Sequence, residues 1–134
     1  MLKLCERTNK YAELVPNRAL CAAYSKFMLE LSSPQLAFNL DTNDEYSQPH
    51  PGSYSTDQGN VTYVCPGIHP VYNIPNAQGA NHTKEFTAAV ITEEAYLLTL
   101  DTAKGMAATA WEVLKDDDFA RQVRAEFEKT MASK

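Results

Sequence analysis

Apolar residues recur at steps of three and four positions in three parts of the chain, which is the spacing of one face of an α-helix. The first part follows Asn17, a residue that suits an N-cap, and runs to Leu31. The sequence Ser32-Ser33-Pro34 comes next and should end the helix. The second part runs from about Thr92 to Leu114. These two patterns predict two amphipathic helices, and the many alanines of the second would allow close packing.

A third helix is predicted after the acidic triplet at 116–118, which breaks the second helix and supplies negative charge to the next first turn. Its apolar side is formed by Phe119, Val123 and Phe127 at four-residue steps. We expect all three side chains to pack on one side, with the two aromatic rings carrying most of the burial because valine is the smallest of the set.

Two short apolar runs, Val61–Cys65 and Val71–Ile74, are typical of β-strands, with Pro66-Gly67 between them and Pro75 after the second. From Gln35 to Gly59 the chain is polar and aperiodic, which favours a functional loop or a segment that awaits a partner surface. The order of helix, loop, two strands and two helices predicts an α/β fold with an incomplete sheet.

The composition narrows the classes of protein. With 134 residues, 44% of them hydrophobic and 22% charged, the chain has the size and balance of a single globular domain. A net charge of −5 argues against nucleic acid or an anionic membrane as partner, since both need clustered Lys and Arg. No apolar run approaches the roughly 18 residues of a membrane span, and the first residues lack the core of a signal peptide. Three cysteines without CxxC spacing favour a reducing, cytoplasmic location.

Three histidines, His50, His69 and His82, are the candidate metal ligands. Divalent zinc binds imidazole nitrogen and carboxylate oxygen, and a catalytic site leaves one position open for water. None of the three lies in an HExxH or HxH arrangement, so spacing alone favours a hydrogen-bonded or exposed histidine.

The motif Asn81-His82-Thr83-Lys84-Glu85-Phe86 resembles one found late in the catalytic domain of the M20 family of metal-dependent aminoacylases and dipeptidases, although relatives often carry proline where Lys84 stands. The stretch 102–110 resembles the alanine-rich helix that follows this motif in the dipeptidase subgroup. Residues 15–20 resemble the point where the chain leaves the lid domain. The resemblance covers nearly the whole chain. The three motifs together are specific for this family, although no single one of them would be.

The resemblance implies roles for three residues. It makes His82 a ligand of one of two divalent metal ions, zinc being the expected metal. For His69, within Ile68-His69-Pro70, it implies a place in the substrate pocket, beside the simpler interpretation of a strand-end histidine bonded to backbone. For Asp57 it implies an ordering role through hydrogen bonds to a ligand, beside that of a loop cap. The Glu93-Glu94 pair is interpreted as first-turn helix charge rather than as the catalytic pair of the family.

By the same resemblance, residues 1–15 would end a lid and dimerisation domain, and residues 16–134 would form the C-terminal half of a three-layer, zinc-peptidase-like α/β catalytic domain. The whole enzyme would be a homodimer that hydrolyses dipeptides with a basic C-terminal residue. The first metal-binding histidine motif, the bridging ligand and the catalytic Glu-Glu pair of the family have no counterpart in this sequence, so no catalytic residue is assigned. The alternatives are a truncated, non-catalytic binding protein and an incomplete gene model.

Overall fold

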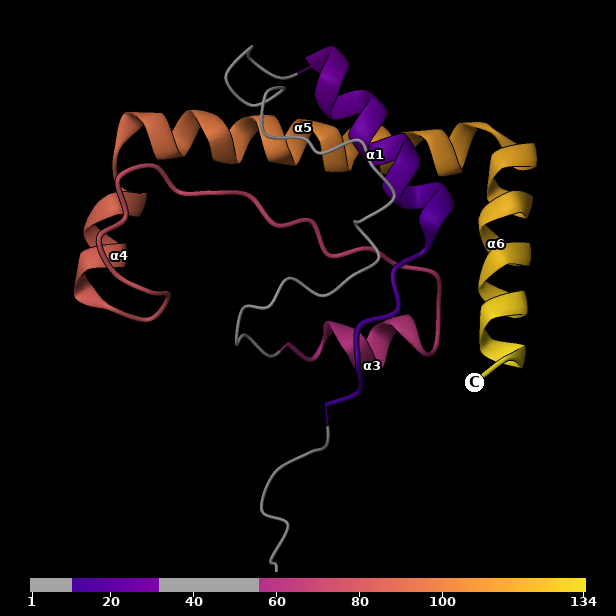
Figure 1. Ribbon diagram of the computed structural model, residues 1–134. Coiled ribbons are helices and arrows are strands. Elements are labelled where there is room, and N and C mark those ends of the chain that lie inside the picture. The colour runs from indigo at the N-terminus through magenta and orange to yellow at the C-terminus, as the bar shows by residue number, and fades with distance from the viewer. Residues whose placement is uncertain (1–10, 32–55) are drawn as a thin grey trace, which may run out of the picture.

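The computed structural model describes residues 11–31 and 56–134, and this part of the protein is built from helices (Figure 1). The first ten residues and residues 32–55, which include His50 and most of the polar segment predicted at 35–59, lie outside the described residues. The last two residues of that predicted segment, Gln58 and Gly59, belong to a helix. The helices, in chain order, are α1 (Arg18–Leu31), α3 (Gln58–Thr62), α4 (Lys84–Val90), α5 (Glu93–Lys115) and α6 (Asp117–Ala132). None of them is long and apolar enough to cross a membrane.

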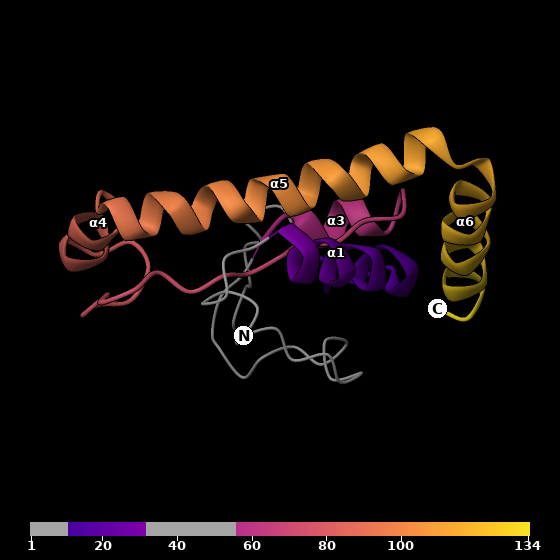
Figure 2. The same ribbon diagram turned by 90° about the horizontal axis from the view of Figure 1, so that it is seen from above.

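The long helix α5 is the axis of the structure. α1 crosses it, α4 lies at its beginning and α6 turns away from its end (Figure 1). Seen from above, α1 and α3 lie on the same side of α5 (Figure 2). At the crossing, a Cβ added to Gly105 would lie 2.3 Å from Sδ of Met28, which is only 1% exposed. The glycine therefore allows α1 to approach α5 closely.

The three helices predicted from periodicity are confirmed, because their start signals act locally. Asn17 Oδ1 accepts a hydrogen bond from the backbone N–H of Leu20 at 3.1 Å. Thr92 caps α5 in the same way, and the Asp116 carboxylate caps α6 through two backbone N–H groups. Each cap satisfies donors that the first turn of a helix leaves without an internal partner.

The strand predicted at Val61–Cys65 is wrong. Its first two residues belong to α3, and the backbone then turns, with the N–H groups of Val64 and Cys65 both donating to the carbonyl of Val61. A strand needs a neighbour to satisfy its backbone groups, and no such ladder occurs among the described residues. The backbone is satisfied locally instead.

The strand predicted at Val71–Ile74 is also absent from the described structure, where these residues have no regular secondary structure. The segment runs along α5 (Figures 1 and 2). Its contacts are made by side chains: the hydroxyls of Tyr72 and Thr99 lie 2.9 Å apart, and Ile74 is buried against Ala89 and Ala95. The three-layer α/β architecture is thus not shown by the described residues, which are mostly helical.

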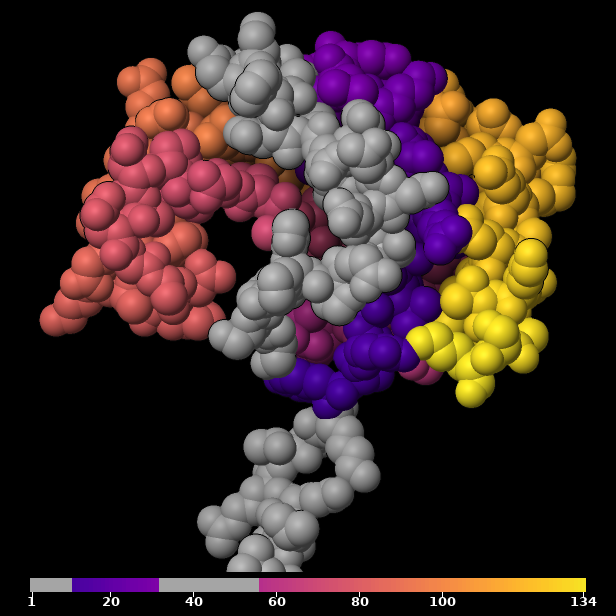
Figure 3. Space-filling view, viewed as in Figure 1, coloured from indigo at the N-terminus to yellow at the C-terminus, as the bar shows by residue number. Residues whose placement is uncertain are grey.

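Among residues 11–31 and 56–134 the core is small and divided into two clusters, one toward the α6 side and one toward the α4 side of the molecule (Figure 3). One joins Ala19 and Leu20 of α1 to Val123 of α6. The other cluster contains Ile74, Ala89 and Ala95 and lies near α4. In α6, Val123 is 5% exposed, and Phe119 and Phe127 are partly buried. Phe119 packs against the cluster that Val123 shares with α1.

Candidate functional site

His82 lies in the turn that leads into α4, and its side chain is exposed. Its backbone φ of 70° falls in the left-handed region, which is unfavourable for a residue with a Cβ. Neighbouring hydrogen bonds hold the turn: Thr83 Oγ1 accepts from the N–H of Phe86 at 3.2 Å and donates to the carbonyl of Ala80 at 2.8 Å. The N-cap of α4 therefore fixes the direction in which the chain presents His82.

Gly79 completes this turn. A Cβ at this position would lie 2.6 Å from Thr83 Oγ1, so any larger residue would displace the capping hydroxyl. The carbonyl of Thr83 in turn accepts from the N–H and the hydroxyl of Thr87. His82, the predicted metal ligand, is thus carried by a well-bonded turn. Its side chain is open to solvent and can reach a metal ion that is held by other residues.

His69 is exposed and lies in the irregular connection between α3 and α4. The residue before it, Ile68, packs against the cluster of Ala19, Leu20 and Val123. In the described structure His69 does not end a strand, so that simpler interpretation is not supported. Its neighbour anchors the chain while the imidazole remains accessible.

Asp57 occupies the N-cap position of α3 and is exposed, but its side chain makes no capping hydrogen bond. Only its backbone contributes, through the carbonyl that accepts from the N–H of Asn60 at 3.0 Å. The interpretation of Asp57 as a loop-capping side chain is therefore not supported, and its carboxylate is left facing solvent.

A further arrangement, in which α3 holds residues 12–15, has no signal in the sequence. Asn60 Oδ1 accepts from the N–H of Ala12 at 2.7 Å, and Thr62 Oγ1 accepts from the N–H of Val15 at 3.1 Å. A Cβ on Gly59 would lie 2.0 Å from the carbonyl oxygen of Ala12. We call this contact the α3 clamp; only glycine allows the two backbones to approach so closely.

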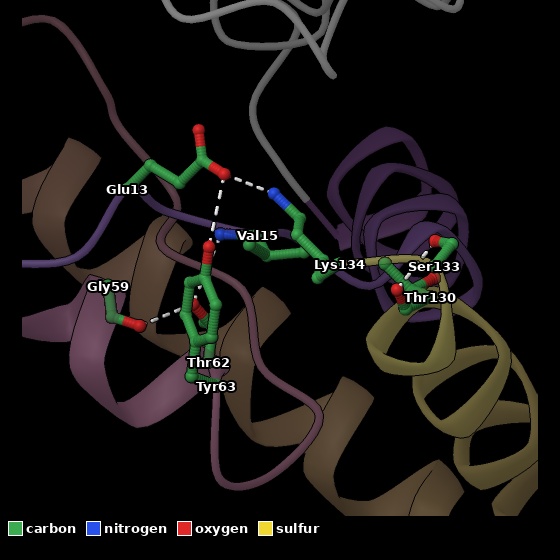
Figure 4. Close-up of polar contacts among 8 residues, drawn as sticks. All are labelled: Glu13, Val15, Gly59, Thr62, Tyr63, Thr130, Ser133 and Lys134. Atoms are coloured by element: carbon green, nitrogen blue, oxygen red, sulfur yellow. Dashed lines mark hydrogen bonds and ion pairs between the residues drawn. The ribbon is translucent and has the colours of Figure 1, made fainter.

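Beside the α3 clamp, three side chains meet at the surface (Figure 4). The Tyr63 hydroxyl donates to the Glu13 carboxylate at 3.1 Å, and the Lys134 ammonium forms an ion pair with the same oxygen. These two hydrogen bonds, that from Lys134 first, lower the pKa of Glu13. The contact ties the chain beyond α6 to the chain before α1.

The predicted site residues are not gathered into a metal centre. His82 precedes α4, whereas Asp57 begins α3, and the two helices lie apart in both views (Figures 1 and 2). Within the described ranges no group of three or more His, Cys, Asp or Glu side chains could hold a metal ion. These residues alone do not fit a two-zinc site, and His82 can contribute a single ligand.

Comparison with known proteins relates the chain to dipeptidases. It is 37% identical over 117 residues to a mouse protein named Xaa-Arg dipeptidase, and 34% identical over 117 residues to the human protein of that name. Each match covers 87% of this chain, and the chain spans about a quarter of the length of these relatives. No family model matches the sequence. No solved structure matches it either.

Proposed function

We propose that this chain forms the C-terminal part of the catalytic domain of an M20-type, metal-dependent dipeptidase that acts in the cytoplasm. The observation that carries the proposal is the 37% identity over 117 residues to Xaa-Arg dipeptidase. In this proposal residues 16–134 belong to the catalytic domain, and residues 1–15 end a lid domain through which the enzyme dimerises.

His82 is the proposed metal ligand. Its imidazole is exposed at a turn that the Thr83 cap holds in place, so it can reach a metal ion whose other ligands come from elsewhere in the enzyme. The metal, which we propose to be zinc in a pair of ions, would activate water for attack on an amide carbonyl. His82 serves this chemistry by holding a neutral nitrogen at a fixed position.

His69 and Asp57 are proposed to serve the substrate. Both side chains are exposed, and neither is used to stabilise a helix end. We assign His69 to the pocket that receives the dipeptide and Asp57 to hydrogen bonds that orient a ligand. The relatives' name points to a dipeptide with a C-terminal arginine, and we propose a basic residue at that position of the substrate.

A second candidate function is that of a non-catalytic binding protein. It is favoured by the lack of a complete ligand group among residues 11–31 and 56–134. The two proposals differ in one respect that is easily measured: the first requires that residues of this chain support hydrolysis once the remaining ligands are supplied.

The test is a graft in which residues of this chain replace the matched 117 residues of human Xaa-Arg dipeptidase. We expect the graft to hydrolyse dipeptides with a C-terminal arginine. His82→Ala should reduce its metal affinity or its activity by about tenfold to a hundredfold or more, because a ligand is lost. The measurements are metal content by mass spectrometry and the rate of dipeptide hydrolysis.

His50→Ala is the matched control, since no ligand role is assigned to it, and it should leave both quantities unchanged. Undiminished metal content and activity in His82→Ala would remove the ligand assignment. A graft that folds and binds metal but hydrolyses no dipeptide would favour the non-catalytic function.

A further inference from the structure

One side of α5 is apolar and uncovered. Tyr96 is 59% exposed, Leu100 37%, Trp111 63% and Leu114 77%. Together with two exposed alanines these residues follow steps of three and four along the helix. We define this surface as the outer face of α5: Tyr96, Leu100, Ala103, Ala107, Trp111 and Leu114. In Figure 2 the side of α5 away from α1 and α3 carries no other described helix.

The side of α5 that is buried is, by contrast, small and largely polar. It contains Thr102, Gly105 and Thr109, of which Gly105 lies against Met28 and Tyr24 of α1. Each threonine hydroxyl donates to a carbonyl of its own helix, to Leu98 at 2.9 Å and to Gly105 at 2.8 Å, so its burial leaves no group unsatisfied. A helix normally buries its more apolar side. Here the larger apolar side remains open.

The charges of α5 do not interrupt the outer face. Lys104 pairs with Asp101 at 2.8 Å, and Lys115 pairs with Glu112 at 2.9 Å. Both acids are well shielded from solvent, with side chains 11% and 24% exposed, so the ion pairs draw the lysines toward the covered side. The result is an apolar strip more than four turns long, with small alanines between large side chains, on which an apolar surface can pack closely.

We propose that the outer face of α5 binds the part of a Xaa-Arg dipeptidase-like polypeptide that lies outside the matched 117 residues. About three quarters of each relative lies outside that match, so a large body of chain is available there to cover the equivalent helix. This inference rests on the proposed function, because the partner is taken from the same relatives.

A lipid surface fits the face less well. Helices that lie on membranes combine an apolar face with unpaired lysines and arginines that attract anionic lipids. The lysines of α5 are paired, and the chain has a net charge of −5. A second copy of this chain is the other alternative partner for the outer face of α5. The experiment tests both alternatives, the lipid surface and the second copy.

The experiment mixes the full 134-residue chain with human Xaa-Arg dipeptidase from which the matched residues are deleted. We expect a one-to-one complex by light scattering. Leu114→Glu should weaken it by about tenfold or more, since it places a charge in an apolar contact. Val64→Glu is the matched control: Val64 is also 77% exposed but lies outside α5, and its substitution should not change the affinity.

Trp111, the only tryptophan of the chain, supplies an independent readout. The chain is labelled with fluorotryptophan, and access of a soluble paramagnetic agent to Trp111 is followed by fluorine NMR. The same measurement on the graft, where Trp111→Phe assigns the signal, covers the case of an insoluble deletion protein. We expect Trp111 to be accessible in the chain alone and protected in both the complex and the graft.

An accessible Trp111 in the folded graft, or a complex that Leu114→Glu leaves intact, would overturn the inference. Protection of Trp111 in a dimer of the chain alone, or on vesicles of anionic lipid, would overturn it in favour of those occupants. An inactive complex that protects Trp111 would retain the docking surface but reject the dipeptidase function. An active graft with an accessible Trp111 would support the dipeptidase function but reject the docking surface.

Discussion

Asn17 shows how one residue can serve two helices. Its side-chain oxygen caps α1, and its side-chain nitrogen donates to the carbonyl of Val123 in α6 at 3.0 Å. The residue is 5% exposed, so water cannot replace either bond. A second link follows at once in the chain, where the Glu126 carboxylate accepts from the N–H groups of Arg18 and Ala19. The first turn of α1 is thus bonded to α6.

Asn17→Ala should lower the free energy of unfolding by about 1–3 kcal/mol, because it removes both a helix cap and a buried hydrogen bond between α1 and α6. Urea unfolding followed by circular dichroism measures this loss. Asn73→Ala replaces an exposed asparagine outside the helices and should stay within about 0.5 kcal/mol of the parent. Equal effects of the two substitutions would show that Asn17 does not join α1 to α6.

At this scale the sequence predicts what is local. The cap of α1 was predictable because Asn17 precedes a helical pattern directly. Its bond to Val123 was not, since the partner is 106 positions away. The exposure of His82 is compatible with its predicted role, but the left-handed backbone at that residue has no signature in the Asn-His-Thr sequence.

Among the elements, the three long helices were predictable, whereas the short helices α3 and α4 were missed and the two predicted strands were not found in the described residues. α1, α5 and α6 carry their own caps and their own periodicity, so each can be recognised without knowing its neighbours. A strand depends on a partner for its hydrogen bonds, and residues 61–65 lack one in the described structure. The same residues then satisfy their backbone through α3 and the turn after it.

Gly59→Ala should open the α3 clamp. The added methyl group meets a backbone carbonyl, which cannot move aside as a flexible side chain can, so the clash should cost about 1–3 kcal/mol of stability. The amides of Ala12 and Val15 should exchange with deuterium faster, since their acceptors are displaced.

Gly67→Ala is the control for this prediction. An added Cβ there would lie 3.3 Å from a methyl carbon of Thr62 and 3.4 Å from the amide nitrogen of Gln58, far looser contacts than the 2.0 Å approach of a Gly59 Cβ to the Ala12 carbonyl oxygen. Its exchange rates at Ala12 and Val15 should match those of the parent. Unchanged protection in Gly59→Ala would mean that the clamp does not depend on the missing Cβ.

In the molecule as a whole, α5 links two small clusters that lie toward its opposite ends, and its outer face covers neither. The described residues therefore expose an apolar surface of the kind that binding partners cover. The proposed contact of the outer face with a dipeptidase-like polypeptide would cover this surface. His82 is likewise presented to solvent, without companion ligands in the described ranges.

The contact between the two ends of the described chain is sensitive to pH. Lys134 and Tyr63 lower the pKa of Glu13 from its ordinary value of 4.5 by stabilising the carboxylate. A lowered acid pKa contributes stability that is fully present above the ordinary value and is lost as the pH falls through the lowered one. The contact should therefore hold at neutral pH and open only in acid below pH 4.5.

Carbon-13 NMR titration of the Glu13 carboxyl tests this directly. In Lys134→Met the midpoint should rise toward 4.5, since the larger of the two stabilising hydrogen bonds is removed. Tyr63→Phe should produce a smaller rise in the same direction. Lys129→Met removes an exposed lysine of α6 that is not a cause of the shift, and it should leave the midpoint of Glu13 unchanged. If Lys129→Met and Lys134→Met moved the midpoint equally, the shift would reflect the general charge of α6 rather than the Glu13–Lys134 contact.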